Sequence, residues 1–269
     1  MAAGPLLHVS DLHIGSSDQD LEDVAGGLGV LVSEIKPALV VASGDLTHRN
    51  TRAQHERAAA FLRSLGPPVA AVPGNHDVPM LPPWRLINPF DVFEEQWETI
   101  EPTLESRDLV LCGLNSVRPW LYQEGLLGVH QLERVEQTMS RAGPGALRVV
   151  VLHHHLTSAP WRAAKRPLLG RSRALSRLAR AGVELVLSGH VHQASAAASR
   201  EFHWHTAERP LVVAAAPGIG RPRTGRHTEV RGLQVCRAEE TAIELRVYAW
   251  LDGNFSVVAE HRYPRHQDP

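Results

Sequence analysis

The chain has 269 residues and a formal net charge of −1 at pH 7, with 28 Lys and Arg against 29 Asp and Glu. This balance leaves no basic excess to follow a phosphate backbone, so we expect no nucleic acid polymer as a partner. We also expect no membrane span and no signal peptide, since no apolar run approaches ~20 residues. Cys112 and Cys236 lie in apolar, strand-like contexts, which favours reduced core thiols in a cytoplasmic protein.

Strand and helix patterns alternate through the first two thirds of the chain. In chain order they predict a strand at 6–9, a helix at 21–35, a strand at 39–42, a helix at 51–65, a strand at 69–72, a helix near 90–100, a strand at 109–114, a helix near 132–139, a strand at 149–152, a helix near 175–178 and a strand at 183–187. Strand patterns then follow without helices at 202–205, 211–216, 233–236, 243–249 and 255–259. This order predicts one α/β domain over residues 1–269, with the late strands building a second sheet. The apolar residues of the late strands are compatible with core packing and equally with a homodimer.

Five of the predicted strands end in residues of metal-ligand type. The ends are Asp11-Leu12-His13, Gly44-Asp45, Gly74-Asn75-His76-Asp77, His153-His154-His155 and Gly189-His190-Val191-His192. Ligands of open α/β sheets bind outside the carboxyl ends of the strands, so these residues should converge on one edge. Each motif alone is weak, since a capped turn explains it as well. The ordered set predicts a metal site.

The chemistry of these side chains narrows the kind of site. Carboxylate, amide and imidazole ligands without thiolate suit Mn, Fe or Zn. The groups are too many for one tetrahedral ion and fit two ions that share a bridging carboxylate. Two ions ~3.5–4 Å apart stabilise the attacking and leaving oxygens of a displacement at phosphorus. Glycines at 44, 74 and 189 fit tight turns that bring each ligand into the cleft.

Taken together, these motifs resemble those of the calcineurin-like metallophosphoesterases, and GNHD at 74–77 and GHVH at 189–192 are the most specific of them. The resemblance covers nearly the whole chain. It implies an α/β four-layer αββα sandwich of two mixed β-sheets flanked by helices. The compact size looks most like the bacterial class III cyclic-nucleotide phosphodiesterases and glycerophosphodiesterases.

The resemblance also implies roles for individual residues. Seven side chains would be metal ligands, with Asp11, His13 and His192 on the first ion, Asn75, His153 and His190 on the second, and Asp45 bridging them. A water or hydroxide between the ions would attack phosphorus. His76 would stabilise charge on the phosphoryl group or protonate the leaving alkoxide. Asp77 would orient His76 as an outer-shell partner, or would simply cap its turn.

Several histidines remain open at this point. The family ligand is the first of the three in a row, His153, but strand alternation puts His155 on the same face and leaves it as a rival. We expect His154 to line the substrate pocket or to pack as a hydrogen-bonded core residue. For the remaining histidines we expect positions outside the site. His8 should lie in the core, and His48 and His55 should be solvated. His203 and His205 alternate on a late strand that could reach the rim of the cleft. In addition, this chain has Leu156 and Thr157 where related enzymes often place prolines, which leaves the loop shape open.

The function implied is a metal-dependent phosphodiesterase acting on a small phosphodiester, with 3′,5′-cyclic nucleotides as the first candidates. Glycerophosphodiesters, phospholipid-derived diesters and phosphomonoesters are alternatives with the same site. A Ser/Thr protein phosphatase and a DNA-repair nuclease are disfavoured, because the groove-forming insertion and the basic surface are missing. A binding scaffold without catalysis is the alternative from another class, but such a chain would be expected to lack His76 or a ligand.

Overall fold

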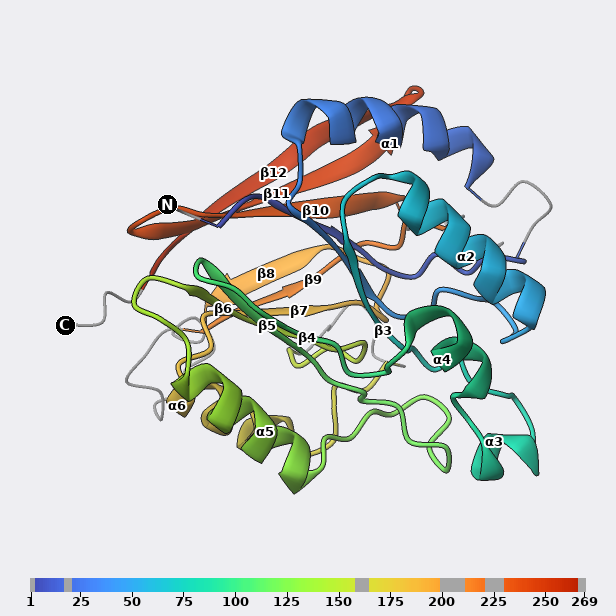
Figure 1. The fold of residues 1–269 in the computed structure, drawn as a ribbon. Coiled ribbons are helices and arrows are strands. Elements are labelled where there is room, and N and C mark those ends of the chain that lie inside the picture. The colour runs from blue at the N-terminus through green and yellow to red at the C-terminus, as the bar shows by residue number, and fades with distance from the viewer. Residues whose placement is uncertain (1–2, 17–20, 158–164, 199–210, 221–229, 266–269) are drawn as a thin grey trace.

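The computed structural model describes residues 3–16, 21–157, 165–198, 211–220 and 230–265. Within these residues, the strands form two mixed six-stranded sheets that pack face to face, with helices on their outer faces (Figure 1). The layers therefore follow the order helix, sheet, sheet, helix, which confirms the predicted αββα sandwich. In the same part of the chain, no helix is long and apolar enough to cross a membrane.

The first sheet carries the N-terminal strands at one side and the C-terminal strands at the other. Its order is β12 (Asn254–Pro264), β11 (Ala242–Leu251), β10 (Gly232–Ala238), β1 (Leu6–Val9), β2 (Leu39–Ser43) and β3 (Val69–Val72). Strands β1, β2 and β3 are parallel, and β10, β11 and β12 are antiparallel. Helices α1 (Glu22–Ile35) and α2 (Arg52–Ser64) pack their apolar residues on its outer face, and α4 (Asp91–Trp97) packs there through Phe93.

The second sheet has the order β4 (Thr103–Glu105), β5 (Leu109–Gly113), β6 (Leu147–Val151), β7 (Leu185–Ser188), β9 (Val212–Ala215) and β8 (Ser195–Ala198). Strands β5, β6, β7 and β9 are parallel, and β4 and β8 add antiparallel edges. Helices α5 (Val129–Ser140) and α6 (Arg171–Arg180) cover its outer face. The short α3 (Trp84–Ile87) stands apart from both sheets (Figure 1).

The late strands are placed differently from the sequence prediction. They do not build a second sheet of their own, because β10 pairs with β1 and the C-terminal hairpin extends the first sheet. Strand β9 instead joins the second sheet beside β7. The expectation fails because partner choice depends on contacts between strands more than 200 residues apart, which a local pattern does not contain. The predicted strand at 202–205 lies outside the described residues.

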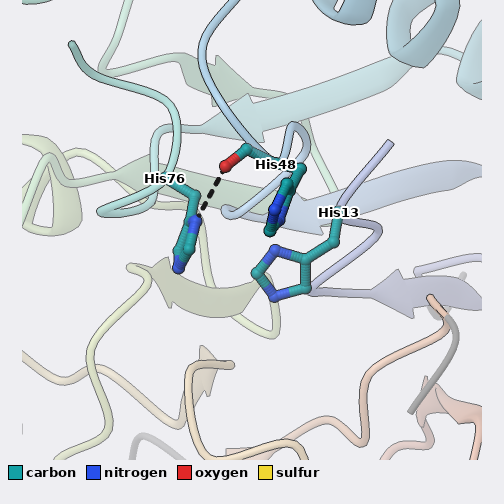
Figure 2. A group of neighbouring side chains, drawn as sticks. All are labelled: His13, His48 and His76. Carbon is teal, nitrogen blue, oxygen red and sulfur yellow. Dashed lines mark hydrogen bonds between the residues drawn. The ribbon is translucent and has the colours of Figure 1, made fainter. Parts of the chain in front are cut away.

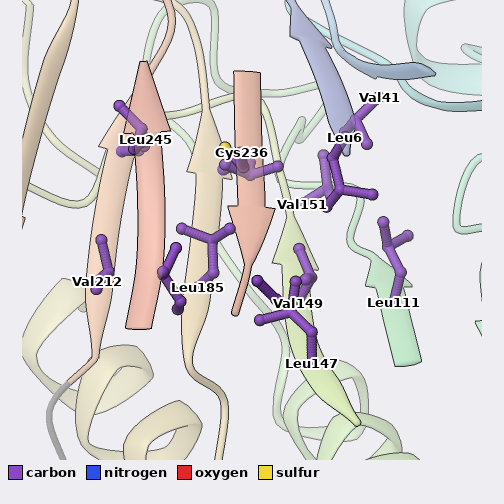
Figure 3. Packing of buried hydrophobic residues seen from close by; sticks show 14 of the residues in the cluster. Leu6, Val41, Leu111, Leu147, Val149, Val151, Leu185, Val212, Cys236 and Leu245 are labelled. Atoms are coloured by element: carbon purple, nitrogen blue, oxygen red, sulfur yellow. The ribbon is translucent and has the colours of Figure 1, made fainter. Parts of the chain in front are cut away.

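Alternation along each buried strand explains how one sheet serves two interfaces. In β1, Leu6 faces the other sheet whereas Leu7 faces the helices. In β2, Val41 faces the other sheet whereas Val40 faces the helices. Figure 3 shows the layer between the sheets, where Leu6 and its neighbours meet apolar residues of β5, β6, β7 and β9. Coverage on both faces is why these strands are mostly apolar.

A buried ion pair joins the two sheets at the end opposite the polar strand ends. Arg265 follows β12, and its guanidinium donates to both oxygens of Glu184 at 2.8 Å and 3.0 Å. Glu184 directly precedes β7, and the two side chains are only 5% and 4% exposed. A pair with this bidentate geometry aligns the sheets at the amino end of β7.

We predict that Arg265→Met lowers the free energy of unfolding by about 3 kcal/mol, because Glu184 would stay buried without its cation. Urea unfolding measures the change. Arg262→Met is the matched control, since Arg262 pairs with Glu239 at the surface, where such a pair contributes ~0–1 kcal/mol. Equal losses in the two variants would contradict the special role of the buried pair.

Candidate metal centre

The polar strand ends of both sheets meet in one place. The loop after β1 is tied to the loop after β2, because the Asp11 and His13 amides donate to the carbonyls of Gly44 and Asp45 at 3.0 Å and 2.9 Å. The loops after β6 and β7 are tied in the same way, by the Gly189 amide donating to the His153 carbonyl at 2.9 Å. All five motifs predicted from the sequence therefore lie at the carboxyl edge where the sheets face each other.

The backbone of these loops is in an unusual conformation. Among the described residues, positive φ angles occur at five non-glycine residues of the motifs, namely Asp11 (53°), His13 (49°), Asp45 (51°), His190 (72°) and His192 (55°). This left-handed region is sparsely populated by residues with side chains, although Asp and His tolerate it better than most. Each such residue costs about 1 kcal/mol or more and persists only where the surroundings hold it. The turns aim the side chains back over the sheet edge.

Two glycines let the loops approach closely. Gly44 has a φ of 84°, as a tight turn requires. Gly74 is needed for a different reason, because a Cβ there would lie 2.2 Å from the Asp45 amide nitrogen and 2.3 Å from Oδ1 of Asp45. The sequence predicted tight turns at both positions, whereas the structure requires close backbone contact at Gly74.

The first cluster contains Asp11, His13 and His192. Their ligand atoms all lie within 4.8 Å of one another, and all three side chains are buried. Nε2 of His192 lies 3.2 Å from Nε2 of His13 and 3.2 Å from Oδ1 of Asp11. Three such atoms that converge from separate loops form a facial set of ligands that could hold one cation.

The second cluster contains Asn75, His153 and His190 next to Asp45. Nε2 of His153 lies 3.2 Å from Oδ1 of Asn75 and 3.1 Å from Nδ1 of His190. Nδ1 of His153 contacts the Ser43 carbonyl at 2.8 Å, so a ring that binds a metal would keep its proton at Nδ1 and offer Nε2 as the ligand atom. One N–H at Nε2 could not satisfy all the acceptors around it.

Asp45 lies between the two clusters. Its Oδ2 is 3.8 Å from Nε2 of His13 in the first cluster and 3.4 Å from Nε2 of His153 in the second. Its Oδ1 accepts a hydrogen bond from the His76 amide at 2.8 Å, which fixes the carboxylate. A single carboxylate oxygen thus faces both sets of ligands, as a bridging ligand must.

The histidines around Asp11 and Asp45 shift the pKa values of these buried carboxylates. Burial alone would raise the pKa of Asp11, but the adjacent His192 outweighs it and holds that pKa below its ordinary value. At Asp45, burial is outweighed by His153 and His76, so its pKa is also lowered. Burial lowers the pKa of His153, but the attraction of Asp45 outweighs it and the pKa rises to about 9. Two carboxylates therefore stay ionised in a buried place.

These residues fit a pair of metal ions. Within the described residues, Oδ1 of Asp11 and Oδ2 of Asp45 are buried and have no hydrogen-bond partner. An ionised oxygen in this state costs several kcal/mol unless a cation compensates it. The donor set of carboxylate, amide oxygen and imidazole suits first-row divalent ions. The structure thus provides ligand atoms for two ions, and the positive charge of these ions would compensate the two buried carboxylate oxygens.

Two separate sets of hydrogen bonds hold the GNHD loop. The Asp77 carboxylate accepts hydrogen bonds from the amides of Gly74, Leu46 and Thr47 at 2.8–3.0 Å, so it clamps the loops after β2 and β3 together. His76 is oriented instead by the His48 carbonyl, which accepts from its Nδ1 at 3.0 Å (Figure 2). Of the two readings left open for Asp77, these contacts are those of the turn cap.

The structure gives distinct surroundings to His8, His154 and His155. His8 is a core residue, with ring nitrogens 3.1 Å from Oε1 of Gln234 and 2.9 Å from Oγ of Ser43. His154 is buried, and its Nδ1 contacts Oγ of Ser116 at 2.8 Å. His155 stacks on the ring of His190 without joining either cluster.

The expectation that His48 and His55 occupy solvated positions is wrong. His55 is buried, and its ring contacts Oδ1 of Asn50 at 2.8 Å. His48 is half-buried beside His13 and His76 (Figure 2). Both positions look solvated in the sequence because polar residues surround them. His203 and His205 lie outside the described residues.

Lys165 is a neighbour of the centre that sequence reasoning missed. Its Nζ lies 3.4 Å from Nδ1 of His190 and 3.4 Å from Oε1 of Gln123. It comes from a loop without a recognisable pattern, so no sequence signal places it there. A cation here adds positive potential on the side of the second cluster.

Comparison with known proteins agrees with this geometry. The chain is similar to the 3′,5′-cyclic adenosine monophosphate phosphodiesterase CpdA of Haemophilus influenzae, with 27% identity over 165 residues. This match covers 58% of the chain and 54% of the relative, so the chain spans about half the length of that protein.

Solved structures share the fold. Purple acid phosphatase PPD1 from yellow lupin (Lupinus luteus) matches with a TM-score of 0.73 at 14% identity, over 98% of this chain and 54% of that one. A dimetal phosphatase from Danio rerio matches with a TM-score of 0.64 at 12% identity, over 96% and 99% of the two chains. The family model described as calcineurin-like phosphoesterase matches residues 4–194, well over half of the sequence. The chain therefore belongs to the calcineurin-like phosphoesterase family.

Proposed function

We propose that this chain is a phosphodiesterase with a binuclear metal centre, and that it hydrolyses small phosphodiesters, with 3′,5′-cyclic nucleotides as the first candidates. The single observation that carries the proposal is the position of Asp45 Oδ2. It is buried, faces a histidine of each cluster and has no hydrogen-bond partner within the described residues. Such an oxygen is suited to two ions that share one bridging carboxylate.

The proposed ligands follow from the two clusters. Asp11, His13 and His192 would hold one ion, Asn75, His153 and His190 the other, and Asp45 both. We propose Mn, Fe or Zn, because the ligand atoms are oxygen and imidazole nitrogen. When bound, two such ions would act as Lewis acids on the phosphoryl group and supply a nucleophile at neutral pH.

Side chains of the protein would stabilise the charge on the phosphoryl group and protonate the leaving group. We propose His76 as the residue that stabilises the phosphoryl charge or protonates the leaving alkoxide. Its Nδ1 donates to the His48 carbonyl, so Nε2 is the atom that can reach the substrate. Asp77 holds the loops that carry His76 and Asp45 at a fixed separation.

The proposed substrate class rests on the similar protein of known substrate. The similar protein of Haemophilus influenzae acts on a 3′,5′-cyclic nucleotide, which supports a small diester for this chain. One observation favours the phospholipid-derived alternative. His192 is one of the residues that line a cavity of about 560 Å³, whose lining is mostly apolar, with Val230, Val247, Leu251 and Val258, and includes Arg231. An acyl or alkyl substituent would suit such a lining better than a charged one.

The compartment is also a proposal. Cys112 and Cys236 are both buried and free, and burial raises the pKa of each thiol, that of Cys236 to about 12. Inert core thiols support a reducing, cytoplasmic setting.

Removal of metal should abolish activity reversibly. We predict that protein stripped by chelation does not hydrolyse bis(p-nitrophenyl) phosphate, and that added Mn²⁺ restores turnover, because the attacking water would depend on the bound ions for its activation at neutral pH. Release of p-nitrophenolate measures the rate, and elemental analysis should find two ions per chain. Full activity of the stripped protein, or no turnover with Mn²⁺, Zn²⁺ or Fe²⁺ despite bound metal, would contradict a general diesterase.

Loss of one ligand should have a large effect. We predict that Asn75→Ala lowers kcat/KM on the same substrate by at least about 100-fold, since even outer-shell partners of a metal contribute ~10–100-fold. Metal content should fall below two ions per chain. Asn254→Ala, at an exposed position of β12, is the control and should behave as wild type. Wild-type activity of Asn75→Ala with two bound ions would remove Asn75 from the ligand set.

A substrate panel separates the candidates. We predict that adenosine 3′,5′-cyclic monophosphate gives a higher kcat/KM than glycerophosphocholine, a lysophospholipid or p-nitrophenyl phosphate at the same metal concentration. Chromatography of the products measures each rate. A preference for a lysophospholipid would favour the apolar cavity at His192 as the substituent site, and a preference for the monoester would overturn the diesterase assignment.

A further inference from the structure

His48 has an unexpected place beside the candidate centre. It lies three residues beyond Asp45, and its ring is stacked on that of His76 at 5.8 Å between centroids and an angle of 19°. The ring of His13 is 6.3 Å from it and nearly perpendicular, at 73°. Figure 2 shows the three rings converging, with one nitrogen of His13 turned toward His48.

The backbone holds His48 firmly in this place. Its amide donates to the Ile14 carbonyl at 2.9 Å, which ties it to the loop that carries His13. Its carbonyl accepts from Nδ1 of His76 at 3.0 Å, which ties it to the loop after β3. The preceding Thr47 is clamped by Asp77 through its amide and its hydroxyl, at 2.8 Å and 2.9 Å. The loop therefore fixes where the His48 ring begins.

The spacing of the three rings suits an oxygen atom. One nitrogen from each of His13, His48 and His76 lies within 4.8 Å of the other two. Two N–H groups can donate to one oxygen when their nitrogens are less than about 5.8 Å apart, which is twice a hydrogen-bond length of ~2.9 Å. Separations of up to 4.8 Å between the ring nitrogens are thus compatible with one oxygen atom shared by the three rings.

His13 adds a second, independent observation. Its Nε2 belongs to the first cluster, 3.2 Å from Nε2 of His192. A ring that ligates through Nε2 carries its proton on Nδ1. This Nδ1 is buried and has no hydrogen-bond partner in the described part of the chain. Because a buried donor without a partner is unfavourable, an acceptor from outside the chain would complete the site.

We propose that His48 is a second substrate-contacting histidine, whose ring N–H donates a hydrogen bond to the leaving-group oxygen of the phosphodiester beside His76. This inference rests on the proposed function. As the P–O bond breaks, the bonding electron pair moves to that oxygen, and the N–H groups around it stabilise the growing negative charge. His48 would therefore favour substrates whose leaving oxygen is basic, such as a sugar alkoxide.

The test compares leaving groups in metal-loaded wild type, His48→Ala and His48→Gln. The substrates are aryl methyl phosphates with phenols of increasing pKa. We expect His48→Ala to lose roughly 10-fold on the most basic leaving group, the worth of one such hydrogen bond, and little on p-nitrophenolate. His48→Gln keeps an N–H donor and should recover part of the loss. The plot of log kcat/KM against leaving-group pKa should therefore be steepest for His48→Ala, with the slope for His48→Gln between those of His48→Ala and wild type.

A binding measurement keeps this test separate from the proposed function. Calorimetry with inorganic phosphate and metal-loaded protein should show weaker binding by His48→Ala, with partial recovery in His48→Gln, whether or not the chain turns over diesters. His130→Ala is the control, since the His130 side chain is 98% exposed. Equal slowing of every leaving group, or an unchanged slope together with unchanged phosphate binding, would overturn the inference. Absence of wild-type turnover would contradict the diesterase proposal alone.

Discussion

The structure depends on the burial of two ionised carboxylates, Asp11 and Asp45, at the edge where the two sheets face each other. Their burial is nearly complete, with at most 1% of either side chain exposed. Such charges are unfavourable in a protein interior unless cations and hydrogen bonds surround them. Histidines from both sheets supply these partners, so the packing of one sheet on the other brings the residues of the centre together.

This constraint explains why the loops of the centre tolerate strained backbone. Left-handed turns at Asp11 and Asp45 aim their carboxylates over the sheet edge, and amide hydrogen bonds across the loops hold them there. The His190 amide adds a bond of 3.0 Å to Oδ2 of Asp11, which links the second sheet to the first. Strain of about 1 kcal/mol per turn is small beside the burial of the two sheets, so the apolar layers can support a preorganised site.

The sequence predicts the motifs and their convergence because both follow from local rules. Apolar runs mark buried strands, and parallel strands end on the same edge of a sheet, which places Asp45 near Asn75. It does not predict that β10 pairs with β1, because this pairing depends on contacts between Leu6 and Cys236 across the chain. His48 was missed for a related reason: its surroundings are formed by loops after three different strands, and its own neighbours in sequence are polar.

Two classes of residue thus meet at one edge, and they differ in how they are held. The candidate ligands stand at strand ends, where the sheets fix them. His48 and Lys165 come from loops between strands and helices, where sequence can change without disturbing the sheets. Because the His48 carbonyl also orients His76, the loop that would contact the leaving group is coupled to the residue that would act on the phosphoryl group. A change confined to the His48 side chain would therefore alter which ester is cleaved, because the backbone that orients His76 would stay in place.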